Sequence, residues 1–151
     1  MSNVQLTASS YSDDFKAIMQ QSFALASHLK SKCITSAHLL VNVFENSSTV
    51  ESLRDVIPNY KECAAKAMEK ATEYGTSTEL SVEDNKVPAQ SIVLSNEAEK
   101  VVLKTQESGS ILGRVDLHQL MIGILLSPDS HAYAVLKENV DILALRKFYS
   151  V

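Results

Sequence analysis

The chain has 151 residues, of which 45% are hydrophobic and 21% are charged, and this composition suits one well-packed domain. Its formal net charge is −4, which argues against a nucleic-acid partner because contacts to phosphate need a basic face. The sequence contains no apolar run long enough to cross a membrane, and its start lacks the pattern of a signal peptide. Cys33 and Cys63 are too few for a disulfide scaffold in a chain of this size, so we expect two buried thiols and a cytoplasmic protein.

The spacing of apolar residues predicts an all-α protein. In the first predicted helix, over residues 12–31, apolar side chains recur at steps of three and four. Residues 76–93 lack this periodicity and are rich in polar side chains, which indicates a linker. Helix starts are predicted from residue types that commonly begin helices: Ser12, Thr35, Thr49, Asn59, Ser95, Asp116, Pro128 and Asp141. The last helix is expected to be shorter than its counterpart, the fourth.

An internal repeat orders these helices. His38 and His118, which are 118 − 38 = 80 residues apart, each stand near the start of an apolar helix and are interpreted as equivalent positions. We therefore predict a single domain, 1–151, that forms an eight-helix bundle from two pseudo-symmetric four-helix repeats. The expected parts are repeat one (11–75), the linker (76–93) and repeat two (94–151). The strongest apolar segments, Leu39–Phe44 and Leu120–Leu126, are expected to be central and to pack together.

The sequence offers no catalytic constellation. His38 and His118 lack a Cys or carboxylate cluster at metal-ligand spacing, and each ring is expected to bond its helix cap or a neighbouring loop. Cys63 lacks the nearby base that a catalytic thiol requires. Gly109 and Gly113 lack the Gly-Lys-Ser/Thr ending of a phosphate-binding loop. We therefore predict no enzyme activity, no cofactor and no metal ion for this chain.

Two segments carry a family resemblance, ITSAHLL at residues 34–40 and VDLHQLM at residues 115–121. Each follows a serine-capped helix and a loop, and a long linker joins the two copies. This arrangement resembles the N-terminal domain of Clp-type AAA+ unfoldases over about residues 12–146. The resemblance implies a double four-helix repeat that lies above a hexameric ATPase ring and binds protein substrates or adaptors. The ATPase modules of such a protein would lie outside this chain.

The chain departs from the relatives that recognise phosphorylated arginine. Those relatives carry a glutamate immediately before each of the two histidines, where this chain has Ala37 and Leu117. The capping residues Ser12 and Ser95 remain, but the anionic partners for a guanidinium are missing. Binding of phosphoarginine is therefore predicted to be absent, and calorimetry should detect no heat.

A partner segment is expected to bind in an apolar groove between the repeats. The candidate residues are Ser12, Phe15, Ile18, Met19 and Phe23 at the first helix, Leu80 and Val82 in the linker, and Ser95. The aromatic and Met side chains could pack adaptably against such a partner. We nevertheless expect at least half of the four apolar candidates of the first helix to be core residues.

Three classes of function remain open at this point. The first is a protein-binding module that recruits substrates or adaptors, as the N-terminal domain of a Clp-family unfoldase or protease. A variant is the sheath-disassembly ATPase of type VI secretion, whose related domain engages a helix of the contractile sheath. The second is a free-standing Clp-repeat accessory protein that docks on a Clp protease, and a phosphate-binding loop encoded beyond Val151 would exclude it. The third, a small-molecule enzyme, lacks the polar constellation that it would need.

Overall fold

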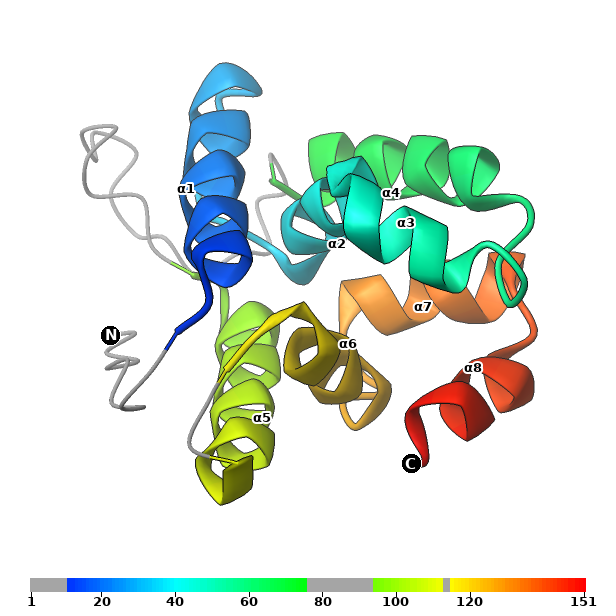
Figure 1. Cartoon of the computed structure of the whole chain (residues 1–151). Helices are drawn as coiled ribbons and strands as arrows, with labels where there is room; N and C mark the ends of the chain where they lie inside the picture. The colour runs from blue at the N-terminus through cyan, green and yellow to red at the C-terminus, as the bar shows by residue number, and fades with distance from the viewer. Residues whose placement is uncertain (1–10, 76–93, 113–114) are drawn as a thin grey trace.

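The computed structural model describes residues 11–75, 94–112 and 115–151, and over these ranges the chain is all-α, as predicted. The predicted linker, 76–93, lies outside the described residues. The helices are α1 (Asp13–His28), α2 (Ser36–Glu45), α3 (Ser47–Leu53), α4 (Tyr60–Gly75), α5 (Asn96–Leu112), α6 (Leu117–Leu125), α7 (His131–Asn139) and α8 (Ile142–Tyr149). In Figure 1, α1–α4 lie in the upper half of the molecule and α5–α8 lie in the lower half. The arrangement is the expected pair of four-helix repeats.

Side-chain caps fix most of the helix starts where the sequence predicts them. The Ser12 hydroxyl accepts a hydrogen bond from the Phe15 amide at 3.1 Å and caps α1. The predicted start of α3 at Thr49 is wrong by two residues, because the Asn46 side chain is the cap and accepts from the Thr49 amide at 2.9 Å. Thr49 is therefore the third residue of α3 and not its first.

The two repeats meet through the starts of their helices. Tyr11 forms an isolated parallel bridge with Val115, and Ile34 forms the matching bridge with Leu94. In both places the amide of the capping serine donates to the strand-like partner, Ser12 to Val115 and Ser95 to Ile34, each at 2.9 Å. The start of α1 thus lies beside the start of α6, and the start of α5 lies beside the start of α2. This exchange is the pseudo-two-fold relation between the repeats.

The bridges correct the predicted register of the repeat. Ile34 and Val115 are equivalent, so the offset at the second helix is 115 − 34 = 81 residues and not 80. His38 therefore corresponds to Gln119, and His118 lies one position earlier in its helix. Both equivalent side chains accept a bond from the amide of their own cap, His38 Nδ1 at 2.9 Å and Gln119 Oε1 at 3.2 Å. The alignment of the two repeats is therefore set by the residues that bond the helix caps and not by matching the two histidines.

One hydrophobic core runs through both repeats and takes in the two apolar segments that the sequence singled out, except that Ile122 is only partly buried against it and Leu126 is 41% exposed. The expectation that these segments pack together is wrong in detail. α2 packs chiefly against α4 and α1, whereas α6 packs chiefly against α5. α7 joins the halves by packing on both α4 and α2. Cys33 and Cys63 are free and buried as expected, and burial raises the pKa of these thiols to about 11 and about 12.

Candidate functional site

The two junctions between the repeats are pseudo-equivalent, but the described residues fill one of them with a side chain and line a cavity at the other. We call the junction of α5 with α2 and α7 the α5–α2 cleft, and the junction of α1 with α3, α6 and α8 the α1–α6 groove. Ser95 and Ser12, both candidate residues from the sequence, stand at these two places and cap α5 and α1. The polar contacts at the two junctions differ.

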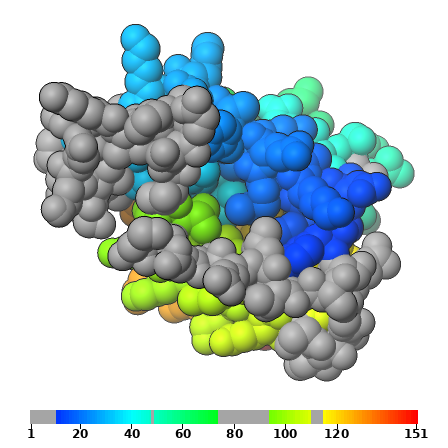
Figure 2. Space-filling view, turned by 90° about the vertical axis from the view of Figure 1, so that its left-hand side faces the viewer, coloured from blue at the N-terminus to red at the C-terminus, as the bar shows by residue number. Residues whose placement is uncertain are grey.

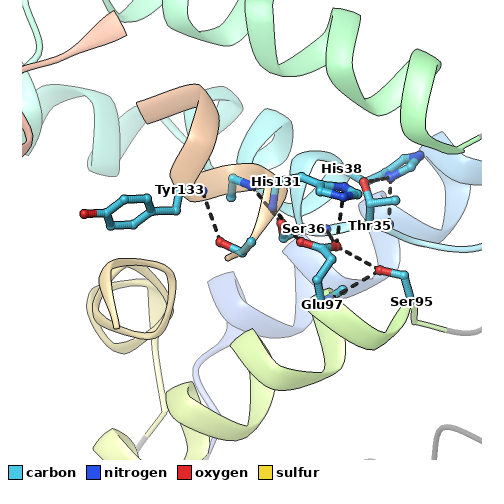
Figure 3. Close-up of polar contacts among 10 residues, drawn as sticks. Thr35, Ser36, His38, Ser95, Glu97, His131 and Tyr133 are labelled. Carbon is cyan, nitrogen blue, oxygen red and sulfur yellow. Dashed lines mark hydrogen bonds and ion pairs between the residues drawn. The ribbon is translucent and has the colours of Figure 1, made fainter. Parts of the chain in front are cut away.

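The carboxylate of Glu97 fills the α5–α2 cleft (Figure 3). Its Oε2 atom accepts hydrogen bonds from the Ser36 amide at 2.7 Å and from the Ser95 hydroxyl at 2.8 Å. Its Oε1 atom accepts from the Ser36 hydroxyl and from the His131 amide, the latter at 2.8 Å. Ser36 and His131 are the first residues of α2 and α7, where the helix dipole favours a negative charge. The cleft is therefore closed by a carboxylate that belongs to the chain.

His38 lies next to this cleft and has a structural role, as predicted. Its Nδ1 atom accepts from the Thr35 amide at 2.9 Å, and its Nε2 atom lies 3.0 Å from the Ser31 hydroxyl. Because an amide can only donate, Nδ1 carries no proton, and the neutral ring holds its proton on Nε2. Burial lowers the pKa of the His38 imidazole to about 4, so the ring is neutral at pH 7.

The α1–α6 groove encloses a cavity of about 350 Å³. Asp14 stands exposed at its wall, and Phe148 is 43% exposed there. The His118 ring lies 4.8 Å from the Tyr149 ring, which Phe148 contacts edge-on at 5.0 Å. Burial raises the pKa of the Tyr149 hydroxyl well above its usual range, so the ring is uncharged. The lining residues are Ser12, Asp14, Asn46, Thr49, Ser52, Asp116, Leu117, His118, Phe148 and Tyr149.

Two sequence differences explain why this groove stays open. Glu97 and Asp14 are equivalent, since each lies two residues after its capping serine, but the aspartate is one methylene shorter. The position of Ser36 is occupied by Leu117, the first residue of α6, which has no hydroxyl to donate. A short acid facing an apolar partner cannot form the bonds that close the α5–α2 cleft.

The remaining candidate residues divide between core and surface. Phe15 and Ile18 are 1% and 2% exposed and belong to the core. Met19 and Phe23 are partly buried and pack against that core from α1. Figure 2 shows that α1 (blue) and α5 (yellow-green) both reach the surface on one face of the molecule. Leu80 and Val82 lie outside the described residues.

The sequence did not predict a site role for Glu97, Asp14, Phe148 or Tyr149. The first two carried a signal, because an acid stands two residues after the capping serine in both repeats. The aromatic pair carried none, since its place beside the start of α6 follows only from the packing of α8 on α6.

The described residues contain neither a candidate metal site nor a candidate membrane-spanning helix. Over the described ranges, no three His, Cys, Asp or Glu side chains are grouped so that they could hold a metal ion. In the same part of the chain, no helix is both long and apolar enough to cross a membrane.

Comparison with known proteins gives matches at the level of structure. No protein-family model matches the sequence, and no curated protein matches it by sequence. The N-terminal domain of Hsp104 from Candida albicans matches with a TM-score of 0.75 at 12% identity, over 93% of this chain and 89% of that one. The N-terminal domain of the caseinolytic-protease-associated chaperone ClpD from Arabidopsis thaliana matches with a TM-score of 0.69 at 12% identity, over 98% of this chain and 97% of that one. The chain has the Clp N-terminal fold.

A third chain with this fold comes from a study of a malarial protein secretion system. It matches with a TM-score of 0.66 at 13% identity, over 93% of this chain and 96% of that one. Because the Clp N-terminal fold is shared at such low identity, the likeness fixes the scaffold and not the binding residues. The contacts of this chain's own residues decide the rest.

Proposed function

We propose that the domain binds segments of substrate or adaptor proteins for a Clp-family ATP-driven unfoldase and that the α1–α6 groove receives them. The main support for this proposal is an open cavity of about 350 Å³ at the junction of the repeats, in a molecule with the Clp N-terminal fold. The domain itself would be non-catalytic and would act in the cytoplasm, a location that suits two free thiols. By holding a segment near the ring, it would raise the effective concentration of the substrate there.

The groove lining favours a segment that carries a basic side chain beside an apolar one. Asp14 and Asp116 contribute carboxylates, and among the described lining residues none is Lys or Arg. Phe148 and Leu117 add apolar surface. A guanidinium can pair with a carboxylate while it stacks on an aromatic ring. A sheath helix that docks by apolar contacts alone receives less support from a groove with two acids.

Fluorescence anisotropy with two labelled peptides tests this proposal. One peptide places arginines between leucines, and the other replaces each arginine with glutamate. We expect only the arginine peptide to bind, and D14N should weaken its binding about fivefold, the effect of about 1 kcal/mol from a partly exposed charge pair. The matched control, E69Q, changes an exposed acid on α4, which contributes nothing to the groove lining. Equal binding of both peptides, or equal effects of D14N and E69Q, would contradict the proposal.

Phosphoarginine is a second probe of the same groove. After the register correction, the positions that hold a glutamate in phosphoarginine-binding relatives are Ala37 and His118, and neither is acidic. The carboxylates that do line the groove would repel the phosphate group. We therefore expect calorimetry to detect no binding of phosphoarginine, whereas micromolar affinity would overturn this assignment.

A further inference from the structure

The α5–α2 cleft is built like a ligand site, although its occupant belongs to the chain. Four donors from three helix starts converge on the Glu97 carboxylate: the amides of Ser36 and His131 and the hydroxyls of Ser36 and Ser95. The Ser36 hydroxyl is held in place, because it also accepts from the Ala132 amide at 2.8 Å. The Nδ1 atom of His131 lies 3.8 Å from Oε2, which is beyond hydrogen-bond distance. Donors in this arrangement match the four lone-pair sites of a carboxylate.

The donors of this cleft depend on a negatively charged partner. Ser36 is fully buried and Ser95 is 7% exposed, so water cannot easily replace the carboxylate. The Glu97 side chain itself is 16% exposed, and one edge of the cleft therefore communicates with solvent. A small anion could enter by this edge if the glutamate side chain were absent.

We propose that the α5–α2 cleft is a carboxylate-binding site that the chain occupies with its own Glu97. The chain thereby closes one of two pseudo-equivalent clefts and leaves the α1–α6 groove for a partner. Glu97 is a built-in ligand: it is supplied two residues after the α5 cap and bound by the first turns of α2 and α7. This inference rests on contacts at the closed junction and does not depend on what the open groove binds.

Thermal unfolding of E97A at neutral pH tests the inference, with sodium acetate compared against sodium chloride at equal concentration. We expect E97A to lower Tm by about 6–12 °C, because buried donors lose their partner. Acetate should then raise the Tm of E97A by about 3 °C or more beyond the effect of chloride, since it binds the vacated site. In an NMR titration of E97A, the amide signals of Ser36 and His131 should shift saturably with acetate.

Two proteins serve as controls, and neither should respond to acetate more than to chloride. Wild type keeps the cleft filled, and E99A removes a neighbouring acid of α5 that takes no part in the cleft contacts. If E97A does not fold, E97S replaces it, because a serine suits the first turn of a helix. Equal effects of acetate and chloride on the vacated variant would overturn the inference. Stabilisation by inorganic phosphate but not by acetate would also overturn it, because the site would then prefer another anion.

Discussion

His38 shows how a buried histidine can be a structural part of a helix start. Its ring replaces the Glu or Gln of a capping box, and Gln119 does the same work at the equivalent position of the other repeat. The difference between them is that an imidazole can titrate and an amide cannot. Protonation of Nδ1 would place a second hydrogen against the Thr35 amide, and burial disfavours the charge further.

The substitution H38Q should remove a pH dependence of stability. In the unfolded chain the His38 pKa returns to 6.5, whereas in the folded protein it is about 4. Between these values the unfolded chain binds a proton that the folded protein does not, so this part of the stability is complete above pH 6.5 and is lost as the pH falls toward 4. We expect wild type to lose about 2 kcal/mol more than H38Q between about pH 7 and about pH 5.

Urea unfolding at the two pH values measures this difference. The comparison uses each protein's own change with pH, so any loss of packing in H38Q that is common to both pH values cancels. An equal change in wild type and H38Q would show that His38 takes up a proton in the folded protein as easily as in the unfolded chain.

The capping residues were predictable from the sequence, because a capping side chain bonds an amide only two or three residues away. Ser12, Asp116 and Asp141 were identified in this way. The Glu97 contacts were not predictable, because its partners Ser36 and His131 are 61 and 34 residues distant. Such contacts depend on how the two repeats pack, and periodicity within one helix carries no information about them.

The helix pairs α1–α2 and α5–α6 are equivalent, but α5 and α6 pack more closely than α1 and α2. Ser22 and Thr105 occupy matching positions, since 22 − 12 and 105 − 95 both equal 10, and Asn42 and Gly123 match in the same way. In the first pair, the Asn42 amide donates to the Ser22 hydroxyl at 3.1 Å. In the second pair, glycine lets the helices approach until a Cβ at Gly123 would lie 2.8 Å from the Val101 carbonyl oxygen.

The substitution G123A should therefore destabilise the protein. Alanine favours a helix by about 1 kcal/mol over glycine, but the clash with the α5 backbone and with Thr105 should outweigh this gain and cost about 1–3 kcal/mol net. The double variant T105A/G123A should recover only part of the loss, because the Val101 carbonyl remains in place. Chemical unfolding of the three proteins tests this, and a G123A variant more stable than wild type would contradict the close approach of α5 and α6.

The fold as a whole could be predicted from the sequence more fully than the site. Apolar periodicity and caps defined two four-helix repeats, and the fold shared with Hsp104 and ClpD domains agrees with that prediction. The register of the repeat was wrong by one residue, because two histidines were matched by identity and not by cap. With the corrected alignment, Gln119 is the counterpart of His38, and His118 is a residue that lines the groove.

The two junctions between the repeats differ in what occupies them. Pseudo-symmetry alone would give two equivalent clefts, but Glu97 and Ser36 close one, whereas Asp14 and Leu117 leave the other with a cavity of about 350 Å³. We therefore expect a partner segment to bind at the α1–α6 groove and not at the α5–α2 cleft. This consequence can be observed directly, because the two junctions contain different residues.

An NMR titration of the wild-type domain with the arginine–leucine peptide is the most direct test. We expect the amide signals of Ser12, Asp14 and His118 to shift saturably, while those of Ser36 and His131 stay in place. Shifts at Ser36 and His131 that match those at Asp14 would contradict the account, because they would show that the cleft occupied by Glu97 is open to a partner.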